Sequence, residues 1–369
     1  MHGTPKQREA ALRVEADIYL INSDGVKWLQ LQKLPDVQAL VVDESTAFKS
    51  FSAKRTKAIL KLAPKFSHRV ILTGTPVPNT MMDIFSQMFV ADLGHHLGKA
   101  ISHFRRKYFL RGGFKGYDWI IRSGAKEQIE RDIAPACYRL DTSQILKMPP
   151  LLVNNVYVDM PTSARAAYKR LEKEMFIELD GGNATAMNAG AKYLLCRQVA
   201  NGAVYTEEDF DVLHDTKLDA VESLREELSG KNVLVAYQFN SDVDRLVRKF
   251  RNVEVVNGKT SGKATEDIVR RWNQGTIPFL AVQPQAMSHG VNLQQGGNDV
   301  IWYGVTDNLE IYLQFNARLH RQGVVGSVRV HRILARGTVD EPIADRIDRK
   351  EATQQSMLDA LRKYRHETS

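Results

Sequence analysis

Two adjacent carboxylates stand at the end of an apolar run, in the stretch ALVVDESTAFKS at residues 39–50. Phosphoryl transfer from a nucleotide needs a magnesium ion and a group that orients the attacking water, and Asp43 and Glu44 are the residue types that meet both needs. Neighbours on an extended strand point to opposite faces, so the chain must turn here for both to serve one site. A solvated strand end or a helix cap is the alternative explanation.

A turn rich in hydroxyl groups follows the next predicted strand. The stretch LTGTP at residues 72–76 places Thr73 and Thr75 on either side of Gly74. Ligands of open α/β sheets bind at the carboxyl ends of parallel strands, so we expect this turn to lie beside the two carboxylates. By itself a Gly-Pro turn is a common feature of loops.

Two arginines form the third candidate group, in QFNARLHRQG at residues 314–323. Gln314, Arg318 and Arg321 follow the spacing i, i+4, i+7, which predicts one face of a helix. Guanidinium groups pair well with phosphate oxygens, so this face predicts an anion site. A solvated basic face is the alternative.

Short apolar runs that alternate with amphipathic helices must position these groups. We predict strands at 17–22, 37–42 and 69–75, and five more strands between residues 232 and 334, with helices between them. The runs are continuously apolar rather than alternating, which favours parallel sheets covered on both faces and an α/β fold. A loop is predicted at 180–191 and a last helix at 341–364.

The stretch at 103–122 interleaves basic and aromatic side chains. This pattern suits a surface that faces DNA, and it equally suits a small aromatic core with a solvated basic rim. The residues concerned are Phe104, Arg105, Arg106, Lys107, Tyr108, Phe109, Arg111, Lys115, Tyr117, Trp119 and Arg122.

Composition narrows the classes of protein. The 369 residues carry 51 Lys and Arg against 43 Asp and Glu, a net charge of +8 that fits a polyanionic partner. No apolar run approaches the ~20 residues that span a bilayer, so no membrane partner is expected. The N-terminus lacks the pattern of a secretory signal, and only two cysteines occur, which predicts a cytoplasmic protein without a zinc site.

Taken together, VVDEST, LTGTP and QFNARLHRQG resemble the second, third and sixth motifs of superfamily-two helicases. The similarity is greatest to Swi/Snf-type double-stranded-DNA translocases, in the short form found in phages and bacteria. If a phage encodes the protein, the resemblance implies that it acts in the cytoplasm of the host. It extends over nearly the whole chain: QPQAMSHGVNLQQGGNDVIWYG is similar to the fifth motif and ILARGTVDEPI to the segment after the sixth. The second motif has Ser-Thr where many relatives have Ala-His or Gly-His, which keeps both carboxylates and changes the outer coupling contacts.

The resemblance implies two RecA-like lobes with mainly parallel sheets, a helical insertion between them, and ATP hydrolysed with Mg²⁺ at the cleft between the lobes. Asp43 would hold Mg²⁺ through water and Glu44 would activate the attacking water. The remaining nucleotide roles would fall to Thr73, Gly74 and Thr75 as coupling residues, Gly290 near ATP, Arg318 and Arg321 as arginine fingers, and Gln314 beside them.

The resemblance also implies double-stranded DNA as the partner, held through its phosphates. Such binding is independent of sequence and sensitive to salt. Our candidates for these contacts are Lys49, Asn79, Gln238, Lys259, Ser288 and Asn292, and an ordinary surface polar residue is the alternative for each.

A phosphate loop of the pattern G-x-x-x-x-G-K-[ST] is the feature we do not find. Gly258-Lys259-Thr260 follows the second and third motifs instead of preceding them, and Val253 stands where the first glycine belongs, so we predict a turn there. We therefore expect an incomplete first lobe without the phosphate-binding lysine, and little ATP turnover by this chain alone. The exposed sheet edge would invite pairing with another chain that carries the missing N-terminal segment.

The predicted domains are the carboxyl-terminal part of the first lobe at 1–79, an insert and linker at 80–212, the second lobe at 213–345 and a last helix at 346–369. Two functions follow from these motifs. The first is an ATP-dependent motor on double-stranded DNA. The second is a DNA-binding accessory module that does not hydrolyse ATP, although such a module has no reason to keep the carboxylates and arginines together.

Overall fold

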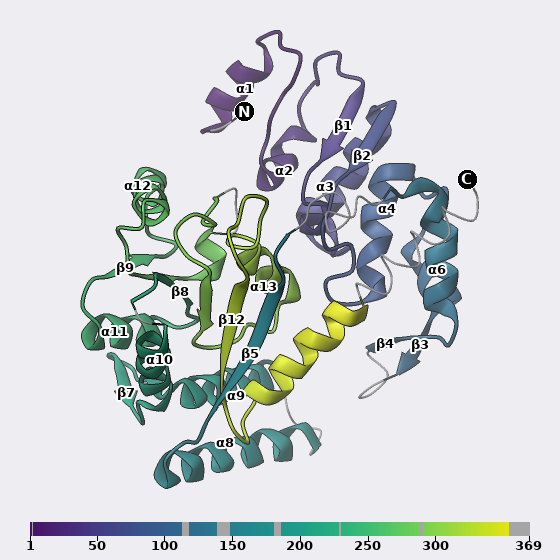
Figure 1. The fold of residues 1–369 in the computed structure, drawn as a ribbon. Helices are drawn as coiled ribbons and strands as arrows, with labels where there is room; N and C mark the ends of the chain where they lie inside the picture. The colour runs from purple at the N-terminus through teal and green to yellow at the C-terminus, as the bar shows by residue number, and fades with distance from the viewer. Residues whose placement is uncertain are drawn as a thin grey trace. The chain divides into compact units, whose positions relative to one another are not determined.

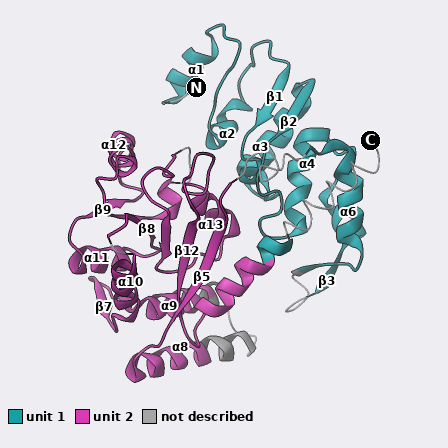
Figure 2. Cartoon of the chain, viewed as in Figure 1, with its two compact units in different colours: residues 1–140, 350–369 teal, residues 141–349 magenta. Residues whose placement is uncertain are grey.

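The computed structural model describes residues 1, 3–112, 118–138, 148–180, 186–228, 230–287 and 291–353. The chain forms two compact units, residues 1–140 with 350–369 (unit 1) and residues 141–349 (unit 2), which Figure 2 colours separately. Within the described ranges, no helix is both long and apolar enough to cross a membrane.

Unit 1 contains a two-stranded parallel sheet (Figure 1). Strand β1 (Ala39–Val42) pairs with β2 (His68–Ile71). Helix α2 (Val26–Leu29) precedes β1, α3 (Lys54–Leu62) connects the two strands, and α4 (Ile84–Asp92) comes after β2. The helix α1 (Pro5–Leu12) begins the unit. The strand predicted at 17–22 is wrong, because this segment pairs with neither strand of the sheet and runs as irregular backbone.

Only one face of the β1–β2 sheet is covered by described residues. Val42 joins a core with Ile59 and Leu62 of α3. On the opposite face Val41 is 60% exposed and Val70, its partner in register, is 49% exposed. The continuous apolar runs predicted that both faces of the sheet would be covered, whereas the described residues cover only one face of the β1–β2 sheet.

The rest of unit 1 packs around aromatic side chains. Its elements are α5 (Ile101–Tyr108), α6 (Ala125–Ile133) and the antiparallel hairpin of β3 (Phe109–Gly112) with β4 (Asp118–Ile121). Phe104, Tyr108 and Phe109 are buried together. The guanidinium groups of Arg105 and Arg111 lie 5.3 and 4.1 Å from the centroid of the Trp119 ring. The aromatic core is thus confirmed, while Lys115 and Tyr117 lie outside the described residues.

Unit 2 is built on a six-stranded sheet in the order β5-β12-β11-β8-β10-β9, in which every neighbouring pair is parallel (Figure 1). The predicted α/β class with mainly parallel sheets is confirmed. The strands are β5 (Leu151–Val158), β8 (Val233–Ala236), β9 (Val253–Val256), β10 (Phe279–Val282), β11 (Asp299–Trp302) and β12 (Val328–Ala335).

Helices cover both faces of this sheet. One core contains side chains from α8 (Thr162–Asp180), α9 (Ala186–Asn201), α12 (Gly262–Asn273) and α13 (Leu309–Asn316), and the other contains side chains from α10 (Thr216–Glu227) and α11 (Asn240–Lys249). Strands β6 (Ala203–Tyr205) and β7 (Phe210–Val212) form a small hairpin. The loop predicted at 180–191 is wrong at residue 180, the last of α8, and from residue 186 onward, where α9 begins; residues 181–185 lie outside the described residues.

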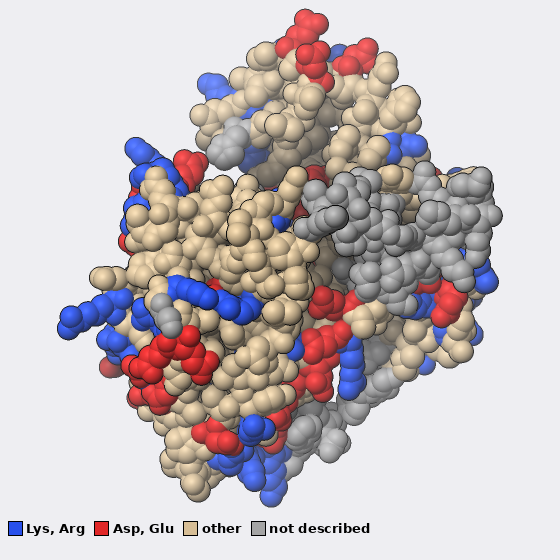
Figure 3. Space-filling model, viewed as in Figure 1, with Lys and Arg blue, Asp and Glu red and all other residues tan. Residues whose placement is uncertain are grey.

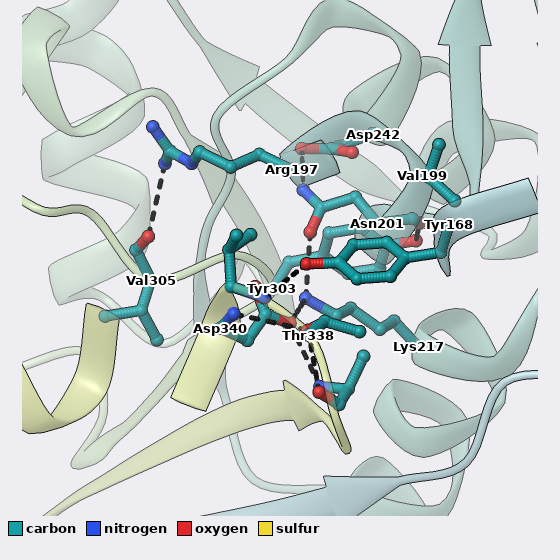
Figure 4. A network of polar contacts seen from close by, with 12 residues as sticks. Tyr168, Arg197, Val199, Asn201, Lys217, Asp242, Tyr303, Val305, Thr338 and Asp340 are labelled. Carbon is teal, nitrogen blue, oxygen red and sulfur yellow. Dashed lines mark hydrogen bonds and ion pairs between the residues drawn. The ribbon is translucent and has the colours of Figure 1, made fainter. Parts of the chain in front are cut away.

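A buried polar network fixes the segment after β12 (Figure 4). The Lys217 ammonium lies 2.6 Å from an Asp340 oxygen and donates to Asn201 Oδ1 at 2.8 Å. Asn201 in turn donates to Asp242. Asp340 begins the last helix, which is described from 340 to 353. Ile343 and Ile347 of that helix are buried in the core of the same unit.

Candidate active site

The two predicted turns lie side by side at the carboxyl edge of the β1–β2 sheet. The sheet pairing continues beyond the strands, since Leu72 N donates to Val42 O at 2.8 Å and Ser45 N donates to Leu72 O at 3.0 Å. Asp43 and Glu44 are therefore held next to the turn that starts at Thr73. The structure brings these predicted residues together within unit 1.

Glu44 makes the turn that the two carboxylates require. Its backbone is left-handed, with φ 48° and ψ 57°. Glu44 N donates to Asp43 Oδ1 at 3.0 Å, and both side chains are exposed. A left-handed conformation costs an L-residue about 1–2 kcal/mol, and such cost is characteristic of functional sites.

The second turn presents a buried hydroxyl group. Thr75 N donates to Thr73 Oγ1 at 3.0 Å, which closes the turn around Gly74. Thr75 is 7% exposed, and within the described part of the chain its Oγ1 has no hydrogen-bond partner. An unmet buried hydroxyl costs about 1–3 kcal/mol, so a ligand atom at this edge would be bound favourably.

A magnesium ion fits the chemistry of this edge. Mg²⁺ is usually held by one or two carboxylates together with water and substrate phosphates. Asp43 is exposed at the strand end, and one of its oxygens is oriented by the Glu44 amide. The residues present thus match a water-rich Mg²⁺ site.

Gln87 is a residue that sequence reasoning missed. It lies on α4, is fully buried, and contacts both turns: its Oε1 accepts from Ser45 Oγ at 2.7 Å and its Nε2 donates to Pro76 O at 2.8 Å. Nothing in its residue type or spacing marked it in the sequence, because its partner Ser45 lies 42 positions away.

The arginine group differs from its prediction. Helix α13 ends at Asn316, so Gln314 is helical and half-buried while Arg318 and Arg321 lie in the turn that follows. The prediction of one helical face is therefore wrong. The reason is tertiary: the buried Asn316 side chain accepts from Trp302 Nε1 at 3.0 Å, and the chain tightens, with Arg318 N donating to Phe315 O.

The turn after α13 packs against the segment predicted as the fifth motif. Arg318 Nη1 donates to Val291 O at 3.4 Å, and Leu293 N donates to Arg318 O at 2.9 Å. Arg321 donates to the Asn292 side chain. Gly290 and Ser288 lie outside the described residues.

The predicted DNA contacts are divided between the two units. In unit 1, Lys49 follows the turn at Asp43 and Glu44 (the carboxylate turn), and Asn79 accepts a hydrogen bond from Lys350 Nζ at 3.2 Å. In unit 2, Gln238 follows β8 and Lys259 lies in a turn after β9, where its amide donates to Asn257 Oδ1 at 2.9 Å. The prediction that Gly258-Lys259-Thr260 is a turn is confirmed.

Charge on the face drawn in Figure 3 is mixed, with Lys and Arg interspersed among Asp and Glu. The net charge of +8 is spread over a surface of 20347 Å². On this face the excess is therefore a weak guide to where a polyanion binds.

Two models of known protein families match this chain. Residues 27–202 match the SNF2-related domain and residues 216–323 match the helicase conserved C-terminal domain. Protein p41 of Acyrthosiphon pisum secondary endosymbiont phage 1 is 35% identical over 98% of this chain and 81% of its own length. The ATP-dependent helicase/translocase YwqA of Bacillus subtilis is 24% identical over 96% of this chain.

The chain spans only part of most of these relatives. It covers 39% of YwqA and 24% of the CHD3-type chromatin-remodeling factor PICKLE of Arabidopsis thaliana, which is 25% identical over 89% of this chain. Among solved structures, the Sulfolobus solfataricus SWI2/SNF2 ATPase core in complex with dsDNA is 23% identical, over 86% of this chain and 69% of that one, with a TM-score of 0.42. The two family models, in the order of the motifs, show that this chain belongs to the Swi/Snf-type family of superfamily-two helicases.

Proposed function

We propose that this protein is an ATP-dependent motor that translocates on double-stranded DNA. The observation that supports the proposal is the left-handed turn at Glu44, which follows β1 at the same sheet edge as the turn that contains the unpaired Thr75 hydroxyl. Backbone strain and an unmet buried donor are costs that a folded chain without a ligand has no reason to bear. Membership of the Swi/Snf-type family supports ATP as that ligand.

In this proposal each turn has a separate task. Glu44 accepts a proton from the attacking water, and the Glu44 amide holds Asp43 in the orientation that suits a hydrated cation. The Mg²⁺ ion, when bound, neutralises charge on the phosphates. The turn at Thr73, Gly74 and Thr75 responds to the γ-phosphate through the Thr75 hydroxyl.

The residues of unit 2 bind the same nucleotide in this proposal. Arg318 and Arg321 stabilise the charge that develops on the transferred phosphoryl group, with Gln314 and Gly290 near the nucleotide. Contacts of both arginines with residues 291–293 support this role, because they hold the guanidinium groups in place before a ligand binds.

We further propose that another polypeptide segment, on this chain or a separate one, covers the open face of the β1–β2 sheet. Val41, Val70 and Leu72 are 48–60% exposed there, whereas the strands β8, β10 and β11 of unit 2 are buried throughout. A cavity of about 770 Å³ borders the same sheet, lined in part by Ile18 and Leu20. The covering segment supplies the phosphate-binding lysine, and without it we expect little ATP turnover.

Double-stranded DNA is the proposed second partner, bound through its phosphates. The contact residues are Lys49, Asn79, Gln238, Lys259, Ser288 and Asn292. Binding should then be equal for unrelated sequences and should weaken steeply with salt. Replacing Lys49 or Lys259 by Gln should lower the slope of log K against log salt by about 1 each. A sequence-specific affinity would contradict the proposal.

The domain limits 1–79, 80–212, 213–345 and 346–369 form part of this proposal, as does a location in the cytoplasm. In it, 1–79 completes the first lobe together with the covering segment. Trypsin cleavage within residues 80–212 that leaves the flanking parts folded would support these limits.

The decisive experiment measures phosphate release by the chain together with a polypeptide that carries the phosphate loop, with and without duplex DNA. Glu44→Gln should lower kcat at least about a hundredfold while ATP still binds, because general-base catalysis contributes about 10²–10⁴-fold. Glu15→Gln, an exposed carboxylate of the same unit, is the matched control and should change nothing. DNA binding without any ATP turnover in the reconstituted protein would favour the accessory module instead.

A further inference from the structure

Gln87 is a buried polar residue that bonds to both turns of the candidate site. It projects from α4, whose neighbouring residues Ile84, Phe85 and Met88 are buried in the aromatic core of unit 1. The helix therefore holds the amide in a fixed place. We propose that Gln87 is a positioning residue for ATP hydrolysis, which sets the carboxylate turn and the Thr75 turn relative to each other.

The partners of Gln87 determine how its amide is oriented. Nε2 lies 2.8 Å from Pro76 O and 2.8 Å from Asp83 O. Carbonyl oxygens only accept, so both positions must face the NH₂ group. Oε1 then faces Ser45 Oγ at 2.7 Å, and the Ser45 hydroxyl must donate to it. The amide can therefore adopt one orientation only.

These bonds join the residues next to the proposed catalytic groups. Ser45 directly follows Glu44, and Pro76 directly follows Thr75. Ser45 is 1% exposed, so its hydroxyl has no water to replace Gln87. The backbone bond from Ser45 N to Leu72 O connects the same two turns a second time. Side chain and backbone together thus hold the general base at a set distance from the hydroxyl.

The link also gives the serine of the second motif a partner in this chain. An alanine or glycine at position 45 would offer Gln87 no hydroxyl, and a buried acceptor without a donor is costly. Ser45 and Gln87 are therefore a matched pair in this chain, and a change in one should be felt through the other.

The test uses the full chain reconstituted with the phosphate-loop polypeptide, because the inference rests on the proposed function. Ser45→Ala and Gln87→Met should each lower kcat for ATP by about tenfold, the equivalent of one hydrogen bond of 1.4 kcal/mol, while KM changes less than twofold. The double variant should be no slower than Gln87→Met alone, because the two residues act as one unit. Additive losses in the double variant would overturn the inference.

Two further measurements separate positioning from stability. Gln198→Met removes another buried glutamine, whose Oε1 accepts from Tyr205 N in unit 2, and it should leave kcat unchanged. Amide hydrogen exchange at Ser45 and Thr75 should speed up about tenfold in Gln87→Met and stay unchanged in Gln198→Met. Unchanged exchange at both amides would overturn the link.

The outcomes for the two proposals are distinguishable. If the wild-type protein hydrolyses ATP and Gln87→Met retains full kcat, the positioning role is wrong and the motor stands. If the wild-type chain reconstituted with the phosphate-loop polypeptide hydrolyses no ATP, both proposals are wrong.

Discussion

Replacing Lys217 by Met should destabilise unit 2 by about 3–5 kcal/mol, the usual cost of breaking a buried ion pair. Lys217 is fully buried, and its ammonium group lies 2.6 Å from Asp340 Oδ2. Methionine fills a similar volume but leaves the Asp340 carboxylate buried without its cation. Asn201 Oδ1 also loses a donor at 2.8 Å, which adds about 1 kcal/mol.

The double variant Lys217→Met with Asp340→Asn should recover at least about 2 kcal/mol of this loss. The asparagine oxygen can still accept from Ala335 N, as Asp340 Oδ2 does at 2.9 Å, so the backbone contact survives without a buried charge. Replacing both members of a buried pair is much less costly than removing one. The free-energy coupling between the two sites is therefore the quantity to measure.

Urea unfolding followed by tryptophan fluorescence is the assay. Trp272 and Trp302 are buried in unit 2, and replacing Trp28 and Trp119 by Phe in every variant removes the signal of unit 1. Lys231→Met, at an exposed lysine of unit 2, is the control and should change the free energy of unfolding by less than ~0.5 kcal/mol. A loss below ~1 kcal/mol in Lys217→Met, or additive losses in the double variant, would show that this ion pair does not stabilise unit 2.

Three further predictions concern single sites. Burial raises the pKa of Asp242 to about 6, so between pH ~4 and 6 the folded state binds a proton that the unfolded state does not. As pH rises through that window, the free energy of unfolding of the wild type should fall by ~2–3 kcal/mol relative to that of Asp242→Asn. Unfolding at pH 4 and pH 7 measures this difference, and a difference that does not change with pH would contradict the prediction. Gly202→Ala should lower the free energy of unfolding by more than ~2 kcal/mol, because φ is +100° and the new Cβ would meet His214 O at 2.2 Å. Gly258→Ala, whose Cβ would have nothing within 4 Å, should be tolerated in the same urea unfolding experiment. Thr75→Val should stabilise unit 1 by about 1 kcal/mol and reduce ATPase activity, whereas Thr56→Val, at another unpaired buried hydroxyl, should stabilise without affecting activity; equal activities would count against the role of Thr75.

Local patterns were sufficient for much of the fold. Continuous apolar runs predicted β1, β2 and the strands β8 to β12 of unit 2, because strands of parallel sheets carry apolar side chains on both faces. The short hairpin of β6 and β7 was not predicted. Strand geometry required a turn at Glu44 if both carboxylates serve one site, and the left-handed backbone there makes such a turn. The order of the motifs was sufficient to indicate the family.

Other features depend on contacts between residues far apart in the chain. The segment 17–22 has the composition of a strand, but a strand exists only where a neighbour pairs with its backbone, and none of the described residues does so. Helix α13 ends early because Asn316 bonds to Trp302, fourteen residues away, which places Arg318 and Arg321 in a turn.

The candidate site shows the same division. Residue types and spacing were enough to select Asp43, Glu44 and Thr75 as candidate site residues. Each follows a predicted strand, and few types of side chain can hold a magnesium ion, activate water or bind phosphate. The contribution of Gln87 could not be seen in the sequence, because it lies 42 positions from Ser45 on a helix that reads as apolar. Local sequence specifies turns and strand ends through short-range sterics, whereas the bonds that join two turns arise only when packing of α4 brings a distant amide between them.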